Sequence, residues 1–268
     1  MFEIDEKRRI FVRILVIGDV TSPKGIDHLE RNLWSVREKH RVDLAIVNGE
    51  NASFITGISR ELGERLLRSG ADVITGGNHT LQNRNAYSFL EESDAVIRPV
   101  NFGDSAPGKG YAIANAKGYR VLVINALGNV HIEPNLDSPF NYVERTLRAN
   151  AGKYDFAVLD IHAEATGEKL AVGYAFDGRI NVIFGTHTHV PTADARILPK
   201  GTGYITDVGM CGEGDGILGM EPFSVVQRMR SHVPNKFSPA QGAVVADAAV
   251  FTLDTTTGRV VDIEQFRF

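Results

Sequence analysis

Residues 181–190, NVIFGTHTHV, decide the fold, because a short apolar run here ends in a glycine and two histidines. Residues 181–185 have the character of a buried strand, and Gly185 releases the chain into a loop. Side chains two residues apart in extended backbone point the same way, so His187 and His189 are expected to face one point beyond the strand. Neutral imidazole is the commonest protein ligand for transition metals. The alternative is an ordinary pair of hydrogen-bonded loop histidines.

From residue 10 to about residue 91, apolar runs and helical patterns alternate. This alternation is typical of a parallel sheet with covering helices. The expected strands are 10–17, 42–47, 72–75, 111–116, 120–126 and 156–161, and the expected helices are 25–40, 59–69, 82–91, 141–150 and 164–176. Residues 111–126 predict a hairpin around a Lys-Gly-Tyr turn.

Downstream, the chain continues in shorter elements. The expected elements are strands at 196–198 and 203–206, a helix over 222–232, and a closing hairpin of strands 243–253 and 259–266. Residues 210–220, MCGEGDGILGM, are glycine-rich and predict a loop around the mouth of a site. We find no internal repeat, low-complexity tract or linker, so residues 1–268 are expected to form a single domain with two sheets, after a polar leader at residues 1–9.

Composition indicates a globular protein. The 268 residues are 43% hydrophobic and 23% charged, which is ordinary for a soluble domain and enough for a sizeable core. The net charge of −4 gives no basic footprint for a nucleic-acid backbone, so no long nucleic-acid partner is expected. The net charge does not exclude a small phosphorylated ligand, because a bound metal would supply local positive charge.

The cysteine content and the N-terminus favour a cytoplasmic location. Cys211 is the only cysteine, so no intrachain disulfide can form, which fits a reducing compartment. Residues 1–11 mix acids and bases and lack the apolar core of a signal peptide, and no run reaches transmembrane length, so no membrane contact is expected. Some of the short strands are expected to be exposed, and their free edges would allow a homo-oligomer to form.

Polar side chains follow five of the predicted strands. They are Asp19, Glu50 with Asn51, Asn78 with His79, His162, and His187 with His189. Ligands of α/β sheets bind outside the carboxyl ends of the strands, so these loops are expected to converge on one crevice. Each residue has a structural alternative, since an Asp can cap a helix and a histidine can be a satisfied core residue. Five strands that end this way, four of them through a glycine, favour a functional site.

The residue types in these loops suit a pair of metal ions. Carboxylates and imidazoles together favour Mn, Fe or Zn, and asparagine carbonyls add oxygen ligands. The absence of cysteine from this set argues against a thiolate zinc site. A carboxylate such as Glu50 can bridge two ions about 3.5–4 Å apart, and such a pair activates a water for attack on an electrophile. Phosphorus is the natural target, because both ions can also neutralise phosphoryl oxygens.

These loops resemble those of a known family. The sequences GD at 18–19, GNH at 77–79 and GTHTH at 185–189 resemble the calcineurin-like metallophosphoesterases. NGEN at 48–51, DIHAEAT at 160–166, GTHTHVPTAD at 185–194 and ILPKGTGYITDVGM at 197–210 resemble the blocks of their YmdB-like branch. The resemblance covers about residues 12–266. It implies the metallophosphoesterase fold, a four-layer α/β/β/α sandwich of two mixed sheets, with a dinuclear site and bacterial cyclic-nucleotide phosphodiesterase activity.

The resemblance also implies a role for each residue. One metal would be held by Asp19, Glu50, Asn51 and His189, and the other by Glu50, Asn78, His162 and His187, with Glu50 bridging. The two cofactors would be divalent or trivalent ions of Fe, Mn or Zn. His79, next to the ligand Asn78, would be the general acid that protonates the leaving oxygen.

Several positions depart from the family pattern. Thr21 stands where general metallophosphoesterases carry a histidine, which the YmdB-like branch also lacks and which Asn51 would replace. TSPKGID follows GDV in place of a glycine-rich loop with an arginine, Leu-Gln-Asn follows GNHT where Trp-Asp is common, and ALGNVHI lacks a Gly-Arg pair. These changes spare the proposed ligands and bear on substrate preference.

The function predicted from the sequence is hydrolysis of 2′,3′- or 3′,5′-cyclic nucleotides by a metal-bridging hydroxide, with His79 as the acid. One alternative is a phosphomonoesterase or nuclease on the same scaffold. Another is a metal-stabilised regulator that binds a nucleotide without hydrolysing it.

Overall fold

The computed structural model describes residues 10–54 and 57–268, so the predicted leader at residues 1–9 lies outside the described residues. Within the described part, the strands form two mixed sheets, one of seven strands and one of six. The first sheet has the order β2 (Asp19–Val20), β11 (Met210–Glu213), β12 (Val244–Asp254), β1 (Phe11–Ile17), β3 (Leu44–Asn48) and β4 (Val73–Thr75), with β13 (Arg259–Arg267) paired to β12. The second has the order β5 (Tyr111–Ala116), β6 (Tyr119–Leu127), β7 (Phe156–His162), β8 (Val182–Thr186), β10 (Gly203–Ile205) and β9 (Arg196–Ile197).

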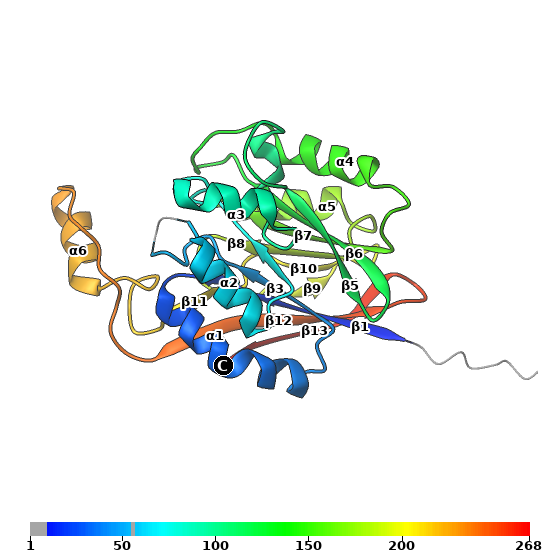
Figure 1. Ribbon diagram of the computed structural model, residues 1–268, viewed down its shortest axis with the longest axis horizontal. Coiled ribbons are helices and arrows are strands. Elements are labelled where there is room, and N and C mark those ends of the chain that lie inside the picture. The colour runs from blue at the N-terminus through cyan, green and yellow to red at the C-terminus, as the bar shows by residue number, and fades with distance from the viewer. Residues whose placement is uncertain (1–9, 55–56) are drawn as a thin grey trace, which may run out of the picture.

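Helices cover both outer faces of the stacked sheets. The helices of the described residues are α1 (Pro23–Lys39), α2 (Arg60–Ser69), α3 (Tyr87–Glu92), α4 (Pro139–Ala149), α5 (Thr166–Ala175) and α6 (Pro222–Ser231), with short 3-10 turns η1 (Arg84–Ala86) and η2 (Val100–Phe102), and all of them except α6 lie against the body. In Figure 1, α1 and α2 lie on one side of the sheets, α4 and α5 lie on the other, and α6 projects from the body. None of the helices in the described ranges is long and apolar enough to cross a membrane.

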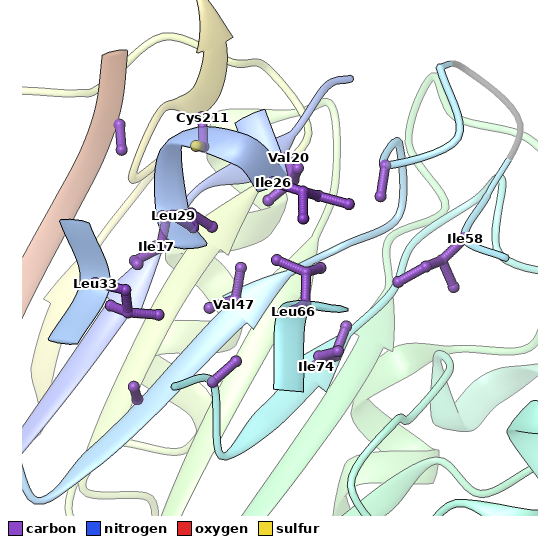
Figure 2. Packing of buried hydrophobic residues seen from close by; sticks show 14 of the residues in the cluster. Ile17, Val20, Ile26, Leu29, Leu33, Val47, Ile58, Leu66, Ile74 and Cys211 are labelled. Atoms are coloured by element: carbon purple, nitrogen blue, oxygen red, sulfur yellow. The ribbon is translucent and has the colours of Figure 1, made fainter. Parts of the chain in front are cut away.

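The first sheet buries its outer face under α1 and α2. Leu29 and Leu33 of α1 and Leu66 of α2 are fully buried and belong to one apolar cluster with Ile17 and Val47 (Figure 2). Side chains alternate between the two faces of a strand, so the neighbours of these strand residues point into the space between the sheets.

The space between the sheets holds a second apolar cluster. Ile14 and Ile46 of the first sheet share it with Val158 and Phe184 of the second. A third cluster lies between the second sheet and its helices; it contains Leu159 of β7, Val143 of α4 and Val172 of α5. The successive layers are helices, sheet, sheet and helices, which confirms the four-layer α/β/β/α sandwich expected from the sequence.

The helix predicted over residues 59–69 shows how local signals set an element's ends. Ser59 caps α2, because its hydroxyl accepts a hydrogen bond from the Leu62 N–H at 3.3 Å. Gly70 ends the helix in the left-handed region with φ 113°, where a glycine has no steric cost.

Three stretches differ from the prediction, and the shortest is β2, where Asp19 and Val20 pair with β11 although no strand was expected there. Residues 210–213, expected as loop, form the buried strand β11, which pairs antiparallel with β12 and parallel with β2. A short strand that is buried on both sides shows no alternation, and its glycine resembles loop sequence. The helix expected over 82–91 is shorter, because residues 79–82 close a turn in which the Gln82 N–H donates to the His79 carbonyl at 2.9 Å.

Candidate active site

The structure brings all eight predicted site residues together where β1, β3, β4, β7 and β8 end. Contacts of 3.7 Å or less connect them without a break. The residues are Asp19, Glu50, Asn51, Asn78, His79, His162, His187 and His189. None of them lies in a separate pocket, so the geometry allows one shared site. Their individual roles remain predictions.

Glu50 lies at the centre of the cluster and is 1% exposed. Its Oε1 lies 3.4 Å from His162 Nε2 and 3.2 Å from His79 Nδ1, and its Oε2 accepts the His79 backbone N–H at 2.9 Å. Burial disfavours the charged carboxylate, but His162 and His79 hold the pKa of Glu50 well below its usual range. Glu50 is therefore an ionised carboxylate whose two oxygens face different partners, as a bridging ligand requires.

Asp19 contributes a second buried carboxylate. Its Oδ2 accepts the His187 backbone N–H at 3.0 Å. Its Oδ1 lies 3.7 Å from His162 Nδ1 and 3.7 Å from His189 Nε2, and it has no hydrogen-bond partner among the described residues. A buried carboxylate oxygen without a partner is costly, and a bound cation would satisfy it.

His162 is fully buried, and its hydrogen bonds determine which nitrogen faces the site. The Thr186 hydroxyl donates its one proton to Asp160 Oδ1 at 2.7 Å, so Thr186 Oγ1 accepts from His162 Nδ1 at 2.9 Å. The Nε2 atom therefore faces the cluster, 3.1 Å from Asn78 Oδ1 and 3.1 Å from His187 Nδ1. Burial opposes a charge on His162, but the Glu50 and Asp19 carboxylates raise its pKa to about 9. Their negative field favours a positive charge at this point.

His187 is oriented by a carboxylate outside the cluster. Its Nε2 lies 3.2 Å from Glu164 Oε2, which makes Nε2 the protonated nitrogen and leaves Nδ1 facing His162. Burial, with the neighbouring His162, lowers the pKa of His187 to about 3, so the ring is neutral. A neutral imidazole whose outer N–H bonds to a carboxylate is the common arrangement of metal-binding histidines.

The loop that carries His187 and His189 is strained and tightly held. The two histidines have φ of 100° and 61°, values that non-glycine residues rarely adopt. Between them, Thr188 donates its backbone N–H and its hydroxyl to Asp207 Oδ2 at 3.1 and 2.8 Å. Asp207 pairs in turn with Lys169 at 2.7 Å, and both side chains are fully buried. This ion pair holds the loop in a conformation that places both imidazoles at the site.

Sequence reasoning missed the residues that support the ligands. Asp160 and Asp207 fall within stretches that were singled out, but nothing separated them from surface acids, and Lys169 looked like an ordinary helix lysine. The signal that could have found Asp160 is its place inside an apolar strand, two residues before His162. Burial raises the pKa of Asp160 to about 6, although hydrogen bonds from Thr75, Thr186 and Asn48 act to lower it.

His79 differs from the other residues of the cluster because it is partly exposed, with 22% of its side chain accessible. Its Nδ1 lies 2.9 Å from Asn51 Oδ1, whereas its Nε2 has no partner among the residues the structure describes. In this orientation Asn51 presents its amide nitrogen to Glu50 at 2.8 Å and to His189 at 3.4 Å. For Asn51 to bind a metal through its oxygen, its amide would therefore have to rotate. The positions of the amide oxygen and nitrogen are assigned from their hydrogen bonds.

The donor set fits a metal ion. Glu50, His162 and His187 each offer a donor atom, and these atoms lie within 4.8 Å of one another. The backbone leaves room beside them only because residue 77 is glycine, since a Cβ there would overlap His162 Nε2 and Glu50 Oε2. With the unpartnered oxygen of Asp19, the cluster combines the carboxylate and imidazole ligands that suit Mn, Fe or Zn.

Comparisons with known proteins found relatives that match nearly the whole chain. A 2′,3′-cyclic-nucleotide 2′-phosphodiesterase of Bacillus subtilis (strain 168) is 41% identical over 254 residues, which are 95% of this chain and 96% of that protein. Crystal structures of a hypothetical protein from Thermus thermophilus and of a novel phosphatase from Mycoplasma pneumoniae each align with a TM-score of 0.89. Their identities are 38% and 32%, and the alignments cover 96% and 97% of this chain and 99% and 94% of theirs. The family model described as YmdB-like protein matches residues 15–266. The chain therefore belongs to the YmdB-like protein family.

Proposed function

We propose that this protein is a phosphodiesterase that uses two metal ions to hydrolyse cyclic nucleotides, in the first place 2′,3′-cyclic nucleotides. The observation that carries the proposal is the cluster of Glu50, His162 and His187 around one point, with the unpartnered Asp19 oxygen beside it. The activity named for the Bacillus subtilis relative supports the substrate class, because that similarity spans nearly the whole of both chains.

The proposed ligands divide into two sets that share Glu50. Asn78, His162 and His187 would hold one ion, and Asp19, Asn51 and His189 would hold the other. When bound, the two ions would activate a water for attack on phosphorus and neutralise the phosphoryl oxygens. The protein's own contribution is rigidity, because Asp160, Glu164 and Asp207 hold the three histidines from behind.

His79 is proposed to supply the proton that the leaving group needs. In a 2′,3′-cyclic nucleotide, the oxygen of water bonds to phosphorus and the bond between phosphorus and O2′ breaks. O2′ leaves as a poor alkoxide unless an acid protonates it, so Nε2 of protonated His79 gives its proton to O2′ and the product is a nucleoside 3′-phosphate. Asn51 and Glu50 hold the ring through Nδ1, which leaves Nε2 available for this transfer.

The decisive experiment is an assay of the purified protein loaded with Mn²⁺, with metal content measured per chain. Substrates are bis-p-nitrophenyl phosphate, 2′,3′-cyclic AMP, 3′,5′-cyclic AMP and the monoester p-nitrophenyl phosphate. We expect turnover of the diesters, best with 2′,3′-cyclic AMP. If both metals are bound and no diester is turned over, the proposal is wrong. Preference for the monoester would support a phosphomonoesterase, and binding of cyclic AMP without hydrolysis would support a regulator.

A further inference from the structure

A cavity of about 350 Å³ opens directly beside the candidate active site. Its lining consists of Asn78, Leu81, Gln82, Phe102, Glu133 and Pro134. Asn78 is shared with the site, since its Oδ1 lies 3.1 Å from His162 Nε2. The volume lies within the range of small-molecule sites, about 300–1,000 Å³. The cavity therefore borders the site at Asn78 and is large enough for part of a ligand bound there.

The wall that contains Phe102 is held rigidly. Phe102 ends η2, and the preceding residue, Asn101, exchanges two hydrogen bonds with the backbone of Leu127, at 2.8 and 2.9 Å. Leu127 is the last residue of β6 and pairs with His162 of β7. The backbone next to Phe102 is thus tied to the end of β6, which pairs with His162 of β7.

The part of the lining that contains Glu133 and Pro134 is also held by hydrogen bonds. Asn129 closes the loop that carries Glu133 and Pro134, because its side chain donates to the Leu136 carbonyl at 2.7 Å and accepts the Leu136 N–H at 3.3 Å. The side chains of Glu133 and Gln82 have no hydrogen-bond or ion-pair partner among the described residues. Both are exposed at the cavity. These polar groups are available to a ligand.

The position of His79 indicates which part of a substrate enters this cavity. His79 lies between Asn78 and the turn that ends at Gln82, whose N–H donates to the His79 carbonyl at 2.9 Å. An acid must lie beside the leaving oxygen, and in a cyclic nucleotide this oxygen belongs to the ribose. The ribose would then lie on the cavity side of the cluster, and the base would be one sugar ring farther from phosphorus.

We propose that this cavity receives the nucleobase of the substrate, with the base stacked on Phe102 and its polar edge read by Glu133 and Gln82. The inference rests on the proposed function and names its substrate more closely. A carboxylate accepts but does not donate hydrogen bonds. Glu133 therefore favours a base with adjacent N–H donors, and guanine is the base that offers N1–H and N2–H side by side. Guanosine 2′,3′-cyclic phosphate is the expected preferred substrate.

The test compares substrates with and without a base. The kcat/KM is measured for guanosine and uridine 2′,3′-cyclic phosphates and for ribose 2′,3′-cyclic phosphate, which keeps the reacting diester but lacks the base. In Phe102→Leu we expect the ratio of guanosine to ribose substrate to fall about 5- to 150-fold, the cost of one base–aromatic stack. In Glu133→Gln we expect the preference for guanosine over uridine to fall. Matched controls are Phe223→Leu and Glu91→Gln, which lie at exposed positions outside the cavity and should change neither ratio.

A binding measurement separates failure of this inference from failure of the proposed function. Guanosine 3′-phosphate and inorganic phosphate are titrated into the Mn²⁺-loaded protein by calorimetry. Weaker binding of guanosine 3′-phosphate to Phe102→Leu, with phosphate binding unchanged, supports the nucleobase site even if no diester is hydrolysed. The inference is overturned if the variants bind both ligands as the unmodified protein does, or if the kinetic ratios stay constant.

Discussion

His187 Nδ1 and His162 Nε2 lie 3.1 Å apart, and the other nitrogen of each ring donates its proton elsewhere, to Glu164 and to Thr186 respectively. Two nitrogen lone pairs that face each other across this distance are stabilised only by a shared proton or a metal cation. Glu50 Oε1, 3.4 Å from His162 Nε2, adds a negative charge at the same point. The two rings and this carboxylate therefore form a point that favours a cation, either a proton on His162 or a bound metal ion.

Removal of a ligand at this point should release metal. We expect Glu50→Ala to lose both ions, because the bridging carboxylate would be gone, and His187→Ala to lose one. Metal content per chain by mass spectrometry checks both variants. His232→Ala is the control, since His232 is exposed at the end of α6 and far from the loops of the cluster in sequence. Full occupancy in Glu50→Ala would contradict the bridging assignment.

The general acid can be separated from the ligands by the chemistry of the leaving group. His79→Ala should keep both metals and lower kcat for 2′,3′-cyclic AMP by about 10²- to 10⁴-fold, the usual contribution of acid catalysis. The loss with bis-p-nitrophenyl phosphate should be much smaller, because p-nitrophenolate leaves without protonation. Equal losses on the two substrates would show that His79 does not donate the proton.

The support behind His162 gives a third prediction. Thr186→Val keeps the shape of the side chain but removes the hydroxyl that accepts from His162 Nδ1 and donates to Asp160. We expect metal affinity to fall about 10- to 100-fold, the usual effect of losing an outer partner of a ligand. Competition with a chelator measures this affinity. Thr186→Ser keeps the hydroxyl and should restore it; a Ser variant as weak as Val would point to packing instead.

The strands and the cluster could be predicted because their signals are local, whereas the four-layer arrangement was expected from the family resemblance. The apolar runs predicted the strands, and the polar residue after each of these strands lies at the same edge of the molecule. Asp19 follows a strand of the first sheet and His187 a strand of the second, and the two residues are in contact. The partners behind the ligands carry no local signal. Lys169 and Asp207 are 38 residues apart, and in sequence a buried lysine on a helix looks like a solvated one.

Nor could the sequence reveal the nucleobase cavity, whose walls come from three separate loops. Residues 81–82, Phe102 and Glu133 become neighbours through tertiary contacts such as the hydrogen bonds between Asn101 and Leu127. The altered residues Leu81 and Gln82, noted in the sequence as departures from the family pattern, line this cavity. Their position agrees with an influence on substrate preference and leaves the metal-binding cluster intact.

The buried ion pair between Lys169 and Asp207 should matter for both stability and the site. In Lys169→Met the Asp207 carboxylate stays buried but loses its cation, and breaking a buried pair in this way costs about 3–5 kcal/mol of unfolding free energy. Asp207 also anchors Thr188, so the strained loop of His187 and His189 should loosen and metal affinity should fall. Urea unfolding and chelator competition measure the two effects. Arg145→Met, which breaks the exposed pair with Asp104, is the control and should change neither quantity measurably.

A Lys169→Met protein that is less stable but binds metal normally would show that the pair stabilises the fold without holding the loop. If both quantities fall, the strain at the two histidines is maintained by an ion pair that lies outside the metal site.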